Sequence, residues 1–347
     1  MKAVVFSGIN TVKVVDVPKP VLETNRDAVI KITHATICGS DLNILNGKIP
    51  VEENAIIGHE GIGVVEEIGS EVKRVKPGDR VAISYSVQCG ECDSCKNGLV
   101  VFCEQGGMLG HGEKWGGFGG CQAEYLRVPW ADANLELIPA GVTEEQAMLV
   151  TDNLVTGYQA CEYGSISPGD VVIVYGAGPV GLCAMASARL FGPSLVVGVD
   201  LLDYRLEAAK RLGVDVVINA SKKNPVEEIK QLTKGKGADV AIEAIGRTET
   251  FDACFDSVKL AGRISILGVF PFDKVGVSLR DLLRRNLQIR AGRANMIHMG
   301  KLMSLIEHNK LDLTSLITHR LPLSEAVEAY RLAISRSDNA IKVLMKP

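Results

Sequence analysis

Four cysteines of this sequence have the spacing of ligands to a single metal ion. They follow the pattern C-x2-C-x2-C-x7-C and are Cys89, Cys92, Cys95 and Cys103. Four thiolates this close along the chain can surround one tetrahedral ion, and the softness of thiolate sulfur favours zinc. Because such a set leaves no coordination position open, the spacing predicts a structural zinc site. The alternative is four unrelated surface thiols.

A second set of metal-binding residue types is scattered. Cys38 and Asp41 lie close together, and His59 and Glu60 are adjacent further along the chain. Neither pair has the local spacing of a zinc motif. A cysteine, a histidine and a carboxylate that converge with one open position would suit a catalytic zinc. From these residues alone, the alternative stays open that the thiol and the histidine are simply buried in a core.

A glycine-rich segment has the pattern G-x-G-x-x-G and its full context. The run VVIVY precedes it, a helical stretch follows, and Asp200 ends the next expected strand about 20 residues later. The cofactor-binding residues expected here are Gly176, Gly178, Pro179, Val180, Gly181 and Asp200. The glycines allow a tight turn, an approach to a pyrophosphate and close helix packing, while the helix N-terminus attracts the phosphates.

Asp200 bears on the choice of cofactor. Its carboxylate would accept hydrogen bonds from the adenosine ribose and would repel a 2′-phosphate, which favours NAD over NADP. The alternatives are a glycine-rich turn that only packs and an aspartate that is only a solvated strand end.

The sequence has two regions with different patterns of expected secondary structure, and these regions must position the candidate site residues. Up to about residue 150, short strand-like runs alternate with turns, for example at 4–6, 28–32, 63–68 and 80–84, which predicts a mainly β region. Beyond it, strand-like runs at 171–175, 194–200, 214–220, 238–246 and 263–269 alternate with helical ones. That alternation predicts a parallel sheet with helices on both faces. The pattern fades near 282–292, and two helices (299–308, 324–335) and a strand (340–345) are expected after it.

Composition excludes several classes of protein. The 347 residues are 46% hydrophobic and carry a net charge of −3, so no basic excess favours nucleic acid. The longest apolar stretch, 171–199, is broken by glycines and prolines, so no membrane span is expected. The start of the chain shows no secretory signal, and the nine cysteines suit metal binding in a reducing compartment. We therefore expect a cytoplasmic protein.

Taken together and in this order along the chain, the motifs CGSD, GHE, the four cysteines and GAGPVG resemble those of the zinc-dependent medium-chain alcohol dehydrogenases. The resemblance covers the whole chain. It implies an α/β protein with a GroES-like β-barrel catalytic domain and a Rossmann domain that has a doubly wound parallel sheet. The catalytic domain is expected at 1–152 and 293–347, with the structural zinc lobe near 89–103, and the NAD-binding domain at 153–292.

The resemblance also assigns roles at the scattered residues. Cys38 and His59 match the first two ligands of a catalytic zinc, and Glu60 matches a neighbouring carboxylate that can transiently bind the metal. Asp41 matches the acid that orients the ligand histidine, and Ser40 matches the hydroxyl that hydrogen-bonds the substrate oxygen.

The third ligand and the cofactor contacts depend on the branch of the family. The segment TDNLVTGY resembles a branch that has an aspartate ligand, which includes secondary-alcohol and glutathione-independent formaldehyde dehydrogenases and implies Asp152. Arg205 matches a basic residue beside the adenosine ribose, or else is a solvated charge on a helix. Asn43 departs from relatives in which a histidine relays the proton. The segment 106–120, with His111 and Trp115, matches the position of pocket-wall residues or packs ordinarily.

The resemblance therefore predicts two zinc ions per chain, NAD as cofactor, a small primary or secondary alcohol or its carbonyl product as substrate, and a homodimer or homotetramer. A polyol- or threonine-type dehydrogenase and a formaldehyde dismutase that retains its NAD are alternatives. A zinc-free binding protein without catalytic activity is a more remote one.

Overall fold

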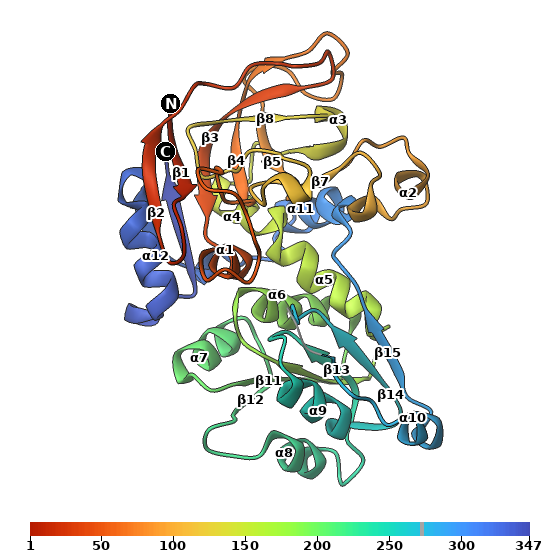
Figure 1. The fold of residues 1–347 in the computed structure, drawn as a ribbon. Helices are drawn as coiled ribbons and strands as arrows, with labels where there is room; N and C mark the ends of the chain where they lie inside the picture. The colour runs from red at the N-terminus through yellow and green to blue at the C-terminus, as the bar shows by residue number, and fades with distance from the viewer. Residues whose placement is uncertain (271–273) are drawn as a thin grey trace. The chain divides into compact units, whose positions relative to one another are not determined.

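The structure is a computed structural model that describes residues 1–270 and 274–347. The chain divides into two compact units, Met1–Val155 with Asn295–Pro347 (unit 1) and Thr156–Ala294 (unit 2). The sequence predicts the second of these units at 153–292, so the structure places its two ends three and two residues later. Both termini lie in unit 1 (Figure 1). Within the described ranges, no helix is long and apolar enough to cross a membrane.

Unit 1 is built mainly from strands. Its strands are β1 (Lys2–Phe6), β2 (Val12–Asp16), β3 (Ala28–Thr36), β4 (Gly61–Ile68), β5 (Arg80–Ile83), β6 (Ser86–Val87), β7 (Gly107–Met108), β8 (Tyr125–Val128), β9 (Leu135–Leu137), β16 (Ile317–Pro322) and β17 (Lys342–Lys346). Its helices are α1 (Gly39–Leu45), α2 (Asp93–Lys96), α3 (Ala131–Asn134), α4 (Glu144–Met148), α11 (Met299–Glu307) and α12 (Ala326–Ser335), and α5 (Asn153–Tyr163) starts here and continues into unit 2.

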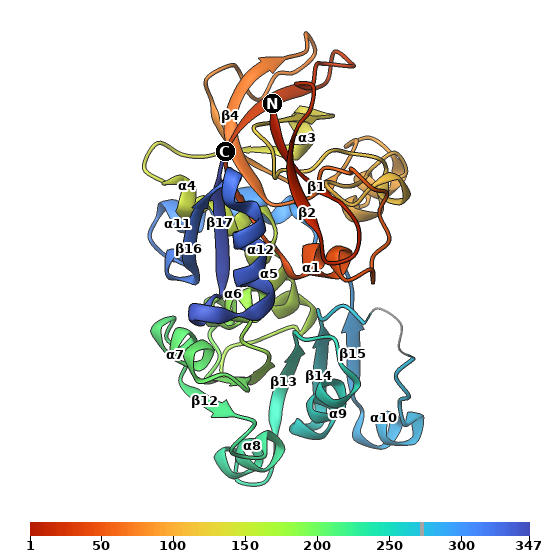
Figure 2. The same cartoon turned by 60° about the vertical axis from the view of Figure 1, so that its left-hand side comes forward.

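The central sheet of unit 1 joins the two ends of the chain. Its order is β16-β17-β3-β4-β5-β9, with β8 also paired to β3. The pairing is antiparallel except between β16 and β17. The helix α12 packs against β17 and β2, as Figure 2 lets the reader follow. Because β17 pairs with β3, the C-terminal strand lies beside the strand that ends at Thr36, two residues before Cys38.

Unit 2 contains the parallel sheet that the sequence predicts. Its strands are β10 (Val171–Tyr175), β11 (Leu195–Asp200), β12 (Val216–Asn219), β13 (Ala238–Glu243), β14 (Val258–Ile266) and β15 (Gln288–Ala291). Its helices are α6 (Pro179–Ala188), α7 (Asp203–Arg211), α8 (Pro225–Leu232), α9 (Thr248–Ser257) and α10 (Leu279–Arg285). The strand order is β12-β11-β10-β13-β14-β15.

Both faces of this sheet are covered by helices. Along β11, Val197 and Val199 pack in a cluster with Ile229 of α8, whereas Gly198 between them faces Met185 of α6. Because successive residues of a strand point to opposite faces, α6 and α8 cover different faces. This is the doubly wound arrangement. Its sixth strand, β15, lies where the sequence pattern fades, because Gln288 and Arg290 interrupt the apolar run of an edge strand.

Candidate metal centres and dinucleotide site

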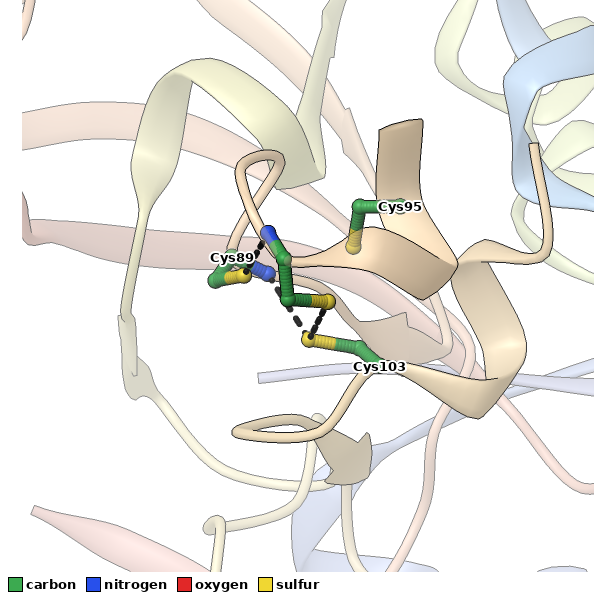
Figure 3. A group of neighbouring side chains, drawn as sticks. Cys89, Cys95 and Cys103 are labelled. Atoms are coloured by element: carbon green, nitrogen blue, oxygen red, sulfur yellow. Dashed lines mark hydrogen bonds between the residues drawn. The ribbon is translucent and has the colours of Figure 1, made fainter. Parts of the chain in front are cut away.

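The four cysteines that have zinc spacing lie together in one loop of unit 1 around α2 (Figure 3). One ligand atom from each lies within 4.8 Å of the others. The backbone N–H of Cys89 donates to Cys103 Sγ at 3.2 Å, and that of Cys92 donates to Cys89 Sγ at 3.3 Å. Backbone donors, first among them the amide of Glu104, lower the pKa of Cys92 to about 7. A loop whose amides favour thiolates fits a tetrahedral zinc ion.

The scattered residues also come together within unit 1. Cys38 caps α1, His59 precedes β4, and Asp152 lies just before α5. Asp152 Oδ2 is 3.4 Å from Cys38 Sγ and 3.6 Å from His59 Nε2. One ligand atom from each of these three residues and from Glu60 lies within 4.8 Å of the others. We refer to these four residues as the Cys38 cluster.

Asp41 orients both Cys38 and His59. It occupies the first turn of α1, and its two oxygens face the Cys38 backbone N–H at 2.8 Å and His59 Nδ1 at 3.2 Å. Burial alone would raise the pKa of Asp41, but His59 and the Cys38 amide hold it below the ordinary value. The Nδ1 contact turns His59 Nε2 towards Asp152 and Ser40, whose hydroxyl oxygen is 3.3 Å away.

The charge of the Cys38 cluster calls for a cation. Burial, followed by the carboxylates of Glu60 and Asp152, raises the pKa of the Cys38 thiol above its ordinary value. His59, Glu60 and Asp152 are buried, and Cys38 is half-buried. A thiol, an imidazole and a carboxylate at these separations fit a divalent ion such as zinc.

Sequence reasoning missed the residues that hold Glu60. Asn153 Nδ2 donates to Glu60 Oε1 at 2.7 Å, while Lys342 Nζ and Thr36 Oγ1 both contact Glu60 Oε2. Lys342 comes from β17 at the far end of the chain. The only feature of the sequence that could have indicated its role is that Lys342 is the one charged residue in the otherwise apolar run IKVLM.

Aromatic rings border the Cys38 cluster. The His111 ring centroid is 5.1 Å from that of His59, and the Trp115 centroid is 6.2 Å from that of His111. Tyr85 lies 6.2 Å from His59 on the same measure. His111 Nδ1 donates to the Leu109 carbonyl at 2.8 Å, which fixes its tautomer. His111 is thus close to the candidate metal site, and Trp115 adjoins it through His111.

The glycine-rich turn in unit 2 lies between β10 and α6. A Cβ on Gly181 would lie 1.8 Å from the Gly176 carbonyl oxygen, so only glycine fits there. Gly176 has a φ of +102°, which suits a tight turn. A Cβ on Gly178 would meet no heavy atom closer than Arg205 Nη1 at 3.9 Å. Pro179 begins α6 and Val180 follows it. The open space at Gly178 beside a helix N-terminus fits a bound pyrophosphate.

Asp200 at the end of β11 faces this turn. Its Oδ2 accepts from the Ala177 N–H at 2.8 Å, and its Oδ1 accepts from the N–H groups of Leu201 and Leu202 at 2.8 and 3.0 Å. Arg205 Nη1 lies 3.8 Å from Asp200 Oδ2. Asp200 and Arg205, the two residues predicted to lie near the adenosine ribose, are therefore both beside the glycine-rich turn. Asp200 also holds the turn through its hydrogen bond with the Ala177 N–H.

Comparisons with known proteins agree with this architecture. Residues 24–139 match the alcohol dehydrogenase GroES-like domain, and residues 179–307 match the zinc-binding dehydrogenase family. An uncharacterized zinc-type alcohol dehydrogenase-like protein of Bacillus subtilis is 40% identical, and the match covers 100% of both chains. The solved structure of an alcohol dehydrogenase from Thermus sp. ATN1 is 36% identical with a TM-score of 0.96, over 100% of this chain and 99% of that one.

Two more distant solved structures, each 27% identical, contain a nicotinamide cofactor. A zinc-binding dehydrogenase of Sinorhizobium meliloti is bound to NADP (TM-score 0.89; 100% of this chain, 99% of that one). A dehydrogenase of Escherichia coli is complexed with NADH (TM-score 0.88; 100% of this chain, 99% of that one).

Proposed function

The chain belongs to the zinc-type alcohol dehydrogenase family, and from this premise we propose how its residues serve metal, cofactor and substrate. It is an oxidoreductase that interconverts a small-molecule alcohol and its aldehyde or ketone. Cys38, His59 and Asp152 hold a catalytic zinc, and the four lobe cysteines hold a structural one, which gives two ions per chain. The observation that carries this proposal is the convergence of a thiol, an imidazole and a carboxylate from distant segments.

The residues around the Cys38 cluster divide the work of proton handling. Zinc, when bound, supplies a Lewis acid that polarises the substrate oxygen and makes an alcohol easier to deprotonate. The Ser40 hydroxyl, beside His59 Nε2, is positioned to hydrogen-bond that oxygen and to relay its proton onward, accepting one proton as it releases its own towards solvent. Asp41 keeps the His59 ring oriented through Nδ1. The burial of His59, Glu60 and Asp152 limits their contact with bulk water.

The cofactor is proposed to be NAD rather than NADP. When bound, its nicotinamide exchanges a hydride with the substrate carbon. The glycine-rich turn and the N-terminus of α6 receive the pyrophosphate. Asp200 supports the preference for NAD because its carboxylate would repel a 2′-phosphate, whereas Arg205 beside it steadies the ribose end.

A substrate panel tests this proposal. The zinc-loaded protein is given primary alcohols, secondary alcohols and diols with NAD+, and with NADP+ in parallel, and NADH or NADPH formation is followed by absorbance. Turnover with NAD+ is expected, with a primary or secondary alcohol preferred. Turnover mainly with NADP+ would contradict the role of Asp200, and a preference for diols would favour the polyol-type alternative.

Unit 2 also supports a homo-oligomer. In the described part of the chain, β15 is an edge strand that pairs with β14 alone. Leu279 and Leu283 of α10 are 77% and 84% exposed, and α10 packs on β14. An open edge strand beside exposed leucines is a template for pairing with a second copy. Light scattering of the wild type and of Leu283→Glu tests this, with a smaller particle expected for the variant.

The cytoplasm is the proposed location. Zinc ligands that are thiolates must stay reduced, and no disulfide joins any of the nine cysteines, all of which lie in the described residues.

A further inference from the structure

Lys342 is buried in an unusual place for a lysine. Its side chain is 0% exposed, it lies on β17 within an apolar strand, and its ammonium group contacts Glu60 Oε2. Burying a charged group costs free energy unless an opposite charge pairs with it. The contact with Glu60 offsets this cost for Lys342. The partner, Glu60, follows the proposed zinc ligand His59 directly.

Glu60 is held at both of its oxygens. Oε1 accepts from Asn153 Nδ2 at 2.7 Å, and Oε2 contacts the Lys342 ammonium and the Thr36 hydroxyl. The same Asn153 amide nitrogen is 2.9 Å from Asp152 Oδ2. Two hydrogen-bond donors from β3 and α5 and one ammonium group from β17 therefore form a cradle around one carboxylate. Each of the three is buried.

Without this cradle, Glu60 would have a strong alternative partner. One of its oxygens lies within 4.8 Å of the ligand atoms of Cys38, His59 and Asp152. A carboxylate is itself a good zinc ligand. The charges also balance: two positive charges on zinc match the Cys38 thiolate and the Asp152 carboxylate, and Lys342 matches Glu60.

We propose that Lys342, with Thr36 and Asn153, limits Glu60 to transient binding of the metal, and that Lys342 is the positioning residue that keeps the open coordination position available to substrate. This inference rests on the proposed zinc site at Cys38, His59 and Asp152. Removing the ammonium leaves the Glu60 carboxylate with the metal as its nearest cation, so Glu60 competes with the substrate for that position.

The test compares Lys342→Met with Lys346→Met. Lys346 is on the same strand and its side chain is 49% exposed, so it provides the same change in charge without the buried pair. Cobalt is placed in the catalytic site, and its visible d–d absorption is recorded without substrate. A carboxylate that replaces water at the open position alters the wavelengths and shape of these bands. We expect the altered spectrum in Lys342→Met alone, together with a KM for the alcohol raised about tenfold and a smaller change in kcat.

Two further variants separate positioning from simple loss of structure. Lys342→Met/Glu60→Gln removes both charges, and its spectrum and KM should return most of the way to wild type because an amide is a poor zinc ligand. If Lys342→Met does not fold, Thr36→Val is measured in its place, because it removes the hydroxyl that contacts the same Glu60 oxygen. We expect its cobalt spectrum to change in the same direction by a smaller amount.

A wild-type spectrum and KM in folded Lys342→Met, or in Thr36→Val where that variant decides, would overturn the proposal. So would a double variant that stays as impaired as Lys342→Met. A wild-type chain that binds metal only at the lobe would instead contradict the proposed catalytic site, and metal analysis of the wild type distinguishes that failure.

Discussion

The cysteine lobe and the Cys38 cluster are both proposed zinc sites of unit 1, yet the chain builds them in opposite ways. The lobe takes all its ligands from the segment 89–103, and backbone amides support the sulfurs. The Cys38 cluster takes its ligands from three distant segments, and side chains such as Asp41 and Lys342 support them. A local loop can therefore specify the first site, whereas only the completed sheet can assemble the second.

The donor sets differ in the same sense. Four thiolates fill a tetrahedron and leave nothing for a substrate, which suits an ion that stabilises the fold. One thiol, one imidazole and one carboxylate leave a position open, which suits an ion that acts on a substrate. A ligand change in the lobe should therefore reduce stability, and a ligand change in the Cys38 cluster should reduce turnover.

The largest effect on activity is expected from Cys38→Ser. Loss of this ligand removes the catalytic zinc and with it several kcal/mol of transition-state stabilisation, so kcat/KM should fall by at least about 100-fold. The free energy of unfolding should change little, because the other supports remain. Steady-state kinetics and calorimetry measure the two quantities. Residual activity above about a tenth of the wild-type value would contradict the role of Cys38 as a zinc ligand.

Cys95→Ser should instead reduce stability. The lobe loses one of four zinc ligands, so its zinc dissociates and the loop loses its internal support. The melting temperature should fall by about 5 °C or more, which corresponds to one or two kcal/mol in a domain of this size. Differential scanning calorimetry measures it. An unchanged melting temperature would argue against a structural zinc in the lobe.

An intermediate effect is expected from Asp41→Asn, because this variant keeps all three proposed zinc ligands and changes only the residue that orients His59. The amide orients His59 less firmly, and such supporting changes cost about 10–100-fold in metal affinity or activity. The rate at which zinc is released to a chelator that absorbs visible light when it binds zinc measures the loss of metal affinity. Asp203→Asn is the matched control, because Asp203 also lies in the first turn of a helix but far from the cluster in sequence. Equal zinc release from both variants would contradict the role of Asp41.

The smallest effect is expected from Glu91→Gln in the lobe. Glu91 Oε1 pairs with Arg26 Nη1 at 2.9 Å, but both side chains are exposed. Water and salt screen surface pairs of this kind, so the melting temperature should shift by no more than about 2 °C. A shift as large as that of Cys95→Ser would mean that surface charge, rather than metal, supports the lobe.

The same contrast explains what could be predicted from the sequence. The lobe spacing, the glycine-rich turn and the first five strands of unit 2 are local patterns, and the structure contains all of them, although β14 spans Val258–Ile266 and not 263–269. The strand β15 was not predicted, because an edge strand alternates polar and apolar residues over a short length.

The support around Glu60 was not predicted for a different reason. Thr36 and Lys342 meet because β17 pairs with β3 across nearly the whole length of the chain, and Asn153 reaches Glu60 from α5. No spacing in the sequence records that pairing. The Cys38 ligands share this difficulty, and only the resemblance to a known family related them in advance.

Metal content per chain tests the central claim most directly. Purified wild type, Cys38→Ser and Cys95→Ser are analysed for zinc by mass spectrometry against protein concentration. The two-site account predicts about two zinc ions in the wild type and about one in each variant, with activity lost in Cys38→Ser and stability lost in Cys95→Ser. A wild type with a single zinc, or a Cys38→Ser protein that keeps both, would contradict it.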